Sequence, residues 1–196
     1  MKTILFTAPY MIPFLDRFRP VLESFGLELI VPDVEERMDE VDLMAYAGQF
    51  DGTICGDDRY TPRVLEACLP RLKVISKWGT GIDSIDAAAC ARLGIIIGNT
   101  PNAFTLPVSD SVMGYLLAFA RRQPWLDKAV KSGRWQKIPG RSLSECTLGV
   151  VGVGDVGKAV VRKARAFGMT LLGNDIVDVN HVFLAETGLN MVPLEM

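Results

Sequence analysis

The sequence has little of what metal centres, disulfide frameworks and nucleic-acid binding require. It contains one histidine, His181, and four cysteines, no two of which are spaced as C-x-x-C. We therefore predict no metal site and no disulfide framework, and we expect reduced, mostly buried thiols. Lysine and arginine together number 21 against 23 aspartates and glutamates, which gives a formal net charge of −2. No basic face follows from that balance, so nucleic acid is not a predicted partner.

The sequence also lacks a long hydrophobic run. A membrane-spanning helix needs about 20 apolar residues in succession, and no stretch approaches that length. The apolar N-terminal segment is interrupted by Pro9 and Pro13 and is not followed by a small-residue cleavage site, which favours a first β-strand over a signal peptide. We expect a cytoplasmic protein with no membrane partner. Its 49% hydrophobic and 22% charged residues are typical of a folded globular chain rather than a disordered one.

Short apolar runs alternate with helical patterns through the first hundred residues. In the first helical pattern Phe14, Leu15, Phe18, Leu22 and Phe25 recur at helical spacing, and we expect Pro20 to start or kink that helix. The predicted strands are 2–8, 27–31, 52–55, 72–76 and 95–98, and the later predicted helices are 39–47, 61–68 and 86–93. Strands that alternate with helices in this way predict a doubly wound α/β unit with a parallel sheet covered on both faces.

The second half begins with two helical stretches, Pro107–Arg121 and Trp125–Ser132, which have no strand between them. We interpret the first as a connector helix, and Trp125 and Trp135 as packing anchors. A strand at 147–151 then restarts a β-α-β pattern, with a helix over 156–167 and a strand at 170–173.

A glycine-rich motif joins that strand to its helix. It reads G-x-G-x-x-G at Gly152, Gly154 and Gly157, and Asp175 follows Gly157 by 18 residues, after the next strand. In a dinucleotide site the first glycine permits a tight turn, the second lets the backbone approach a pyrophosphate, and the third lets the helix pack close to the strand. An acid near this spacing binds the ribose hydroxyls and repels a 2′-phosphate. The motif therefore predicts NAD, favoured over NADP.

Two other interpretations of this motif stay open. It could be a glycine-rich turn with a surface acid nearby, or a methyltransferase-type nucleotide site. The three-residue interval from Gly154 to Gly157 argues against the methyltransferase, whose glycines lie two apart throughout.

A second motif, Lys77-Trp-Gly79-Thr80-Gly81, follows the fourth predicted strand. Loops at the carboxyl ends of parallel strands are where ligands bind, and two close glycines free backbone N–H groups to form a concavity for an anion. Lys77 would add a positive charge suited to a carboxylate. The alternative is a tight turn in which the glycines serve geometry only.

These motifs, taken together in this order, resemble the D-isomer-specific 2-hydroxyacid dehydrogenases, especially the D-3-phosphoglycerate dehydrogenase-like members. The resemblance runs through essentially the whole chain. The matching stretches are KVISKWGTGIDSID (73–86), GIIIGNTPNA (94–103), PVSDSVMGYLLAFAR (107–121), SGRW (132–135) and TLGVVGVGDVGKAVVRKARAFGM (147–169).

The resemblance implies a flavodoxin-like substrate (catalytic) domain over 1–100. Connector helices and the first part of a Rossmann NAD-binding domain follow over 101–196. It implies a small 2-hydroxy or 2-oxo acid as substrate and a homodimer formed through the Pro107–Arg121 and Trp125–Ser132 helices. It assigns Lys77, Gly79 and Gly81 to the substrate. The residues that it assigns to the cofactor are Thr80, Gly152, Gly154, Asp155, Val156, Gly157 and Asp175.

The sequence departs from the family in its catalytic residues. Family members use an Arg, a Glu and a His that lie later in the nucleotide domain, and no matching residues occur up to Met196. His181 lies six residues past Asp175, on the adenosine side, so we interpret it as a surface or helix-start residue and name no catalytic residue. Two hypotheses follow. One is an NAD-dependent oxidoreductase acting on a phosphoglycerate-like acid. The other is a truncated, non-catalytic fragment that acts as a binding or interaction protein.

Overall fold

The chain folds into two compact units in a computed structural model, which describes residues 1–195. Unit 1 comprises Met1–Ala103, and unit 2 begins at Phe104. Each unit has its own sheet and its own hydrophobic core, and each is described by itself below. No helix among the described residues is long and apolar enough to cross a membrane.

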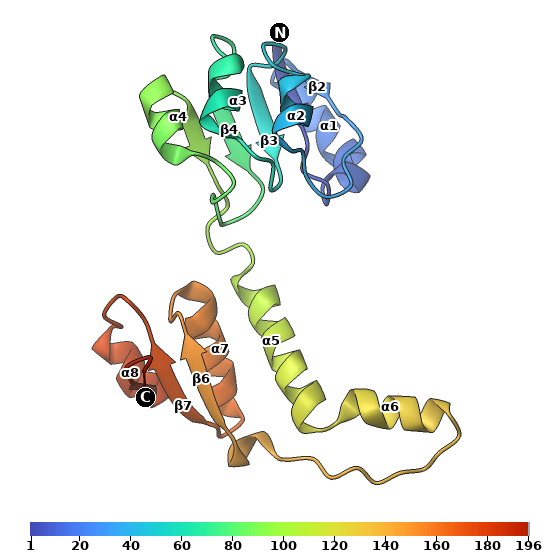
Figure 1. The fold of residues 1–196 in the computed structure, drawn as a ribbon, viewed down its shortest axis with the longest axis vertical. Coiled ribbons are helices and arrows are strands. Elements are labelled where there is room, and N and C mark those ends of the chain that lie inside the picture. The colour runs from blue at the N-terminus through green and yellow to red at the C-terminus, as the bar shows by residue number, and fades with distance from the viewer. Residues whose placement is uncertain (196) are drawn as a thin grey trace. The chain divides into compact units, whose positions relative to one another are not determined.

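Unit 1 is built on a five-stranded parallel sheet with the strand order β2-β1-β3-β4-β5 (Figure 1). That order is the flavodoxin-like form of the doubly wound fold, so the predicted class is confirmed. The strands are β1 (Lys2–Phe6), β2 (Leu27–Ile30), β3 (Gly52–Cys55), β4 (Val74–Lys77) and β5 (Ile96–Gly98). The helices between them are α1 (Leu15–Ser24), α2 (Glu40–Met44), α3 (Pro62–Ala67) and α4 (Ala87–Leu93).

Local sequence signals set the ends of the helices in unit 1. The Thr61 hydroxyl accepts a hydrogen bond from the Val64 N–H, and the Asp86 carboxylate accepts one from the Ala89 N–H at 2.7 Å. Each interaction satisfies one of the free N–H groups at a helix start. The core beneath these helices is fully buried and includes Leu5, Phe50, Tyr60, Leu65 and Ile75. As predicted, three of the four thiols are buried, and all four are free.

Helix α1 differs from its sequence prediction. It begins at Leu15 and continues through Pro20, so the proline does not start the helix. Of the apolar residues at helical spacing, Leu15 is buried, whereas Phe14 and Phe25 are 63% and 77% exposed. The periodicity identified the helix correctly, but it did not identify which apolar side chains enter the core.

Unit 2 has a three-stranded parallel sheet with the order β6-β7-β8. Three parallel strands in this sequential order match the first half of a Rossmann sheet. Its strands are β6 (Thr147–Val151), β7 (Thr170–Asn174) and β8 (Asn190–Met191). Its helices are α5 (Thr105–Ala120), α6 (Gln123–Lys131), α7 (Asp155–Ala166) and α8 (His181–Thr187).

Helix α5 belongs to the core of unit 2. Met113 of α5 is buried in the same cluster as Val161 and Ala164 of α7, and the Lys163 ammonium donates to the Ser109 hydroxyl at 2.6 Å. The helix interpreted as a connector therefore packs on the nucleotide-type β-α-β unit. Trp135 is 87% exposed, so its interpretation as a packing anchor within the chain is wrong.

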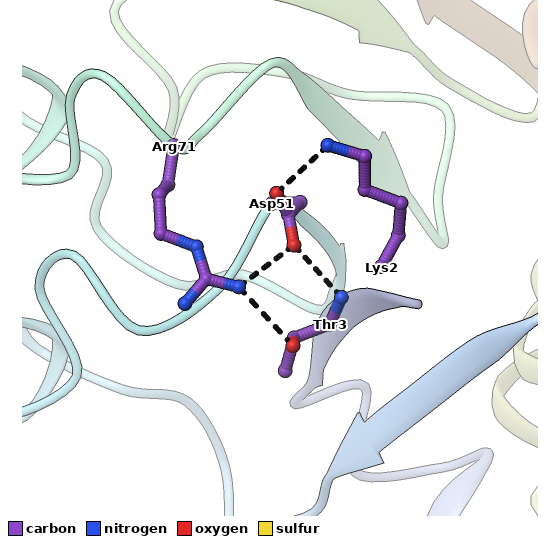
Figure 2. A network of polar contacts seen from close by, with 4 residues as sticks. All are labelled: Lys2, Thr3, Asp51 and Arg71. Carbon is purple, nitrogen blue, oxygen red and sulfur yellow. Dashed lines mark hydrogen bonds and ion pairs between the residues drawn. The ribbon is translucent and has the colours of Figure 1, made fainter.

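A charged network ties together the amino end of the unit 1 sheet (Figure 2). The Asp51 carboxylate, just before β3, accepts hydrogen bonds from the Thr3 N–H and the Arg71 guanidinium, both at 2.8 Å, and from the Lys2 ammonium at 3.2 Å. The Arg71 guanidinium and then the Thr3 N–H lower the pKa of Asp51 well below its usual range. The network joins β1, β3 and the segment that leads into β4.

We predict that Asp51→Asn destabilises the chain by roughly 1–3 kcal/mol at neutral pH, because charge-assisted hydrogen bonds are lost. A carboxyl whose pKa is lowered by folding contributes its full stability above the unfolded-state pKa, and loses it as pH falls toward the folded-state pKa. The difference between the wild type and the variant should therefore shrink below about pH 4. Urea unfolding of both proteins at several pH values measures this difference in the free energy of unfolding. Asp16→Asn, at a fully exposed carboxylate, is the matched control. A difference independent of pH would contradict the prediction.

Candidate functional site

The loop between β6 and α7 requires two of its three motif glycines for steric reasons. Gly152 has φ of +90°, a conformation that L side chains rarely adopt. A Cβ on Gly157 would overlap the Gly152 carbonyl oxygen, so the helix can approach the loop only at a glycine. Gly154 has an ordinary φ of −73°, and a Cβ there would meet nothing within 4 Å. Gly154 therefore borders open space, where a ligand can approach the backbone.

Helix α7 presents its N-terminus at this open space. Gly154 is its N-cap and supplies no side-chain cap, and Asp155 and Val156 begin the first turn. The first N–H groups of a helix have no partner within the helix and carry a partial positive charge. An uncapped helix start behind an open glycine therefore forms a site for a phosphate group.

Asp175 lies at the end of β7 and contacts the same loop. Its carboxylate accepts a hydrogen bond from the Val153 N–H at 2.6 Å and one from the Val177 N–H at 3.0 Å. These backbone N–H groups, first that of Val177 and then that of Val153, lower the pKa of Asp175. The carboxylate is therefore charged at neutral pH and held beside the glycine loop. The structure thus brings together the predicted residues of unit 2, from Gly152 to Gly157, with Asp175.

This arrangement fits the two polar parts of a dinucleotide. The space at Gly154 and the helix start suit a pyrophosphate, and a fixed carboxylate one strand away suits ribose hydroxyls, which are hydrogen-bond donors. The lone histidine does not belong to this site. His181 is the exposed first residue of α8, as predicted. Among residues 1–195, no group of three or more His, Cys, Asp or Glu side chains could hold a metal ion.

The second predicted site lies at the carboxyl end of β4 in unit 1. Thr80 and Gly79 are held against the turn that follows β5. The Asn99 amide donates to the Thr80 carbonyl at 2.7 Å, and the Thr100 N–H donates to the Gly79 carbonyl at 3.0 Å. The Thr80 hydroxyl in turn donates to the Thr100 carbonyl at 3.0 Å. The N-T-P turn at 99–101 thus fixes the conformation of the glycine loop.

Lys77 has partners that the sequence did not suggest. Its side chain is only 4% exposed, and its ammonium donates to the Gly56 carbonyl at 2.6 Å and to the Asp57 carboxylate. The role of Lys77 at a substrate carboxylate stays a prediction. The structure shows in addition that the Asp57 carboxylate neutralises the Lys77 ammonium within the protein. Sequence reasoning missed Asp57. The available signal was its place two residues after the end of β3, at the same sheet edge as Lys77.

Comparisons with known proteins identify relatives for both units. Residues 113–196 match the family model of the D-isomer specific 2-hydroxyacid dehydrogenase, NAD binding domain. The chain is 31% identical to the D-3-phosphoglycerate dehydrogenase of Rattus norvegicus over 180 residues, which cover 90% of this chain and 33% of that protein. It is 35% identical to the glyoxylate reductase of Korarchaeum cryptofilum over 144 residues, 70% of this chain and 43% of that protein. The chain thus spans about a third of the length of the first of these relatives.

Solved structures with the same fold match nearly all of the chain. A protein from Thermus thermophilus superimposes with a TM-score of 0.81 at 28% identity, covering 98% of this chain and 60% of that one. The D-lactate dehydrogenase of Aquifex aeolicus, solved with NAD and lactic acid, gives a TM-score of 0.83 at 24% identity, covering 98% of this chain and 56% of that one. At this identity the second match supports the fold alone.

We predict that two alanine substitutions in the glycine loop have different effects. Gly154→Ala should leave the thermal unfolding temperature unchanged but weaken NADH binding at least about tenfold, because its methyl group occupies the space open to a ligand. Gly157→Ala should lower the unfolding temperature, because its Cβ meets the Gly152 carbonyl. Calorimetric unfolding and titration with NADH separate the two effects. Unchanged NADH affinity in Gly154→Ala would contradict a pyrophosphate at this position.

Proposed function

We propose that this chain is part of a D-isomer specific 2-hydroxyacid dehydrogenase. In this proposal it serves hydride transfer between NAD(H) and a D-2-hydroxy or 2-oxo acid. The observation that carries the proposal is the glycine loop of unit 2, with an open Gly154, an uncapped helix start and Asp175 beside it. The cofactor NAD, when bound, supplies the hydride chemistry, while the protein supplies position and charge.

In this proposal the residues of unit 2 position the cofactor. The backbone at Gly152, Gly154, Asp155 and Val156 binds the pyrophosphate, and Gly157 permits the close approach of the helix. Asp175 accepts hydrogen bonds from the adenosine ribose, and its charge repels the 2′-phosphate of NADP. Because Asp175 already accepts the Val153 N–H, it also holds the loop in the conformation that binds.

The residues of unit 1 take the acid in this proposal. The loop at Gly79 and Gly81 lies against the acid. The Gly79 N–H donates to the Lys77 carbonyl at 3.0 Å, so the backbone donor offered to the anion is the Gly81 N–H. Lys77 lies beneath the loop, and Thr80 is assigned to the cofactor. Two observations support this assignment. The loop lies at the carboxyl end of β4, and hydrogen bonds from the turn at 99–101 hold its conformation. The acid could be phosphoglycerate-like or unphosphorylated, since relatives named for each kind are similar to this chain.

We further propose that the chain forms a homodimer through α5 and α6 and that it is cytoplasmic. Large apolar side chains on these helices are exposed, among them Tyr115 at 75%, Phe119 at 64% and Val130 at 56%. Exposed apolar groups that gather on neighbouring elements favour an interface with a partner. The buried free thiols are consistent with a reducing compartment.

We predict that Asp175→Ala narrows the preference for NADH over NADPH, because the charge that repels the 2′-phosphate is removed. Isothermal titration with each nucleotide gives the ratio of the two affinities. Asp178→Ala removes an exposed acid three residues further on and is the matched control. Equal or tighter binding of NADPH by the wild-type chain would contradict the role given to Asp175.

We predict that the 196-residue chain alone shows no measurable dehydrogenase turnover. The hydroxyl proton must be exchanged with a general acid–base group within hydrogen-bond reach, which contributes about 10²–10⁴-fold to such rates. The only histidine begins α8, on the adenosine side of the nucleotide site. NADH oxidation followed by absorbance over a panel of 2-oxo acids is the measurement. Turnover that disappears in His181→Ala would contradict the prediction, whereas NADH binding without turnover would agree with a non-catalytic binding role for this chain alone.

A further inference from the structure

The carboxyl end of the unit 1 sheet carries a cation whose charge is already compensated. Lys77 ends β4 beside Cys55, the last residue of β3, and the chain then continues through Gly56 to Asp57. The Lys77 ammonium donates to the Gly56 carbonyl and to the Asp57 carboxylate. Because an ammonium has three N–H groups, one donor is left for a ligand.

Lys77 and Asp57 differ sharply in exposure. The Lys77 side chain is 4% exposed, whereas the Asp57 side chain is 79% exposed. A Cβ on Gly79 would lie 3.1 Å from Lys77 Cε and 3.6 Å from its Nζ, so the ammonium lies directly under the glycine loop. A ligand that reaches this loop therefore meets a buried cation together with the exposed carboxylate that neutralises it.

Two arginines near this edge share a single carboxylate. Arg59, which follows Asp57 in the same loop, is paired with Asp39 at 3.2 Å, and Arg37 is paired with the same carboxylate at 3.4 Å, so these three groups together leave one positive charge. Asp58 is fully buried, where its carboxylate accepts hydrogen bonds from the Met38 N–H at 2.7 Å and from the Thr7 hydroxyl.

The glycine loop itself adds a further acid. Asp83 Oδ2 lies 3.2 Å from the position that a Cβ on Gly81 would take, and the Asp83 residue is exposed. A single carboxylate on a ligand can be held by backbone N–H groups and one ammonium donor. A phosphate adds close to two further negative charges, and proteins bind it with arginines, several lysines or a helix start.

We propose that Asp57 is a specificity-determining residue that restricts the substrate to small, unphosphorylated 2-hydroxy or 2-oxo acids. It compensates Lys77 within the protein and places an exposed negative charge where a phosphorylated acid would have to pass or bind. This inference rests on the proposed function. Of the two substrate classes left open above, phosphoglycerate-like and unphosphorylated acids, the inference favours the unphosphorylated acids.

The test compares D-glycerate with D-3-phosphoglycerate, which differ only by the phosphate. Each acid is titrated into the ¹⁵N-labelled 196-residue chain, and the amide signals of Gly79 and Gly81 report binding to the loop. In the wild type, D-glycerate should bind at least several-fold more tightly. In Asp57→Asn the affinity for D-3-phosphoglycerate relative to D-glycerate should rise about two- to fivefold, the size expected when one exposed charge is removed. Glu28→Gln changes the net charge equally at an exposed site beside Thr3, at the amino end of the sheet, and should leave the ratio unchanged.

Three results would overturn the inference: tighter binding of D-3-phosphoglycerate by the wild type, an unchanged ratio in Asp57→Asn, or no shift at Gly79 and Gly81 with either acid. Asp57→Ser provides a second variant should the first fold poorly. Titration with NADH, followed at the Gly154 amide, is a separate readout of the proposed function. A shift at Gly154 together with an unchanged acid ratio rejects the role of Asp57 alone, whereas no shift at Gly154 rejects the cofactor site.

Discussion

The close approach of helix α7 to the carbonyl of Gly152 is the constraint on which the nucleotide-type unit depends. Only a glycine at 157 allows it, because any Cβ there would overlap that carbonyl oxygen. The approach brings the start of α7 up to the end of β6, and it leaves Gly154 bordering open space. Asp175, from the next strand, then fixes the turn through the Val153 N–H. The close approach of α7 to Gly152 therefore determines both the packing of the helix on β6 and the open space at Gly154.

The sheet of unit 1 divides its charged residues between its two ends. At the amino end Asp51 joins three donors, and the pairing ties β1, β3 and the approach to β4 together. At the carboxyl end Lys77, Asp57 and the braced glycine loop lie where a parallel sheet offers space for a ligand. Carboxylates and cations thus stabilise the fold at the amino end of the sheet, and other residues of the same kinds line a candidate site at the carboxyl end.

The sequence predicted the elements whose signals are local. Thr61, Asp86, Gly152 and Gly157 each act through geometry within a few residues, and the helices and turns formed where they indicate. It did not predict which apolar side chains are covered, since Phe14, Phe25 and Trp135 are exposed. Nor did it predict the partner of Lys77, because Asp57 lies twenty residues earlier and only the parallel pairing of β3 with β4 brings the two together.

The pair formed by Lys77 and Asp57 shows why burial matters for assigning function to a charge. A lysine that is 4% exposed needs a compensating group, because removing an ammonium from water without one is costly. A carbonyl from Gly56 and a carboxylate from Asp57 meet that need within the fold. A carboxylate buried with its lysine would add a second desolvation cost. Asp57 instead keeps most of its side chain in solvent beside the glycine loop, where its charge acts on whatever approaches. In the proposed role of Asp57, this one carboxylate therefore compensates the buried lysine and keeps an exposed charge for selecting the ligand.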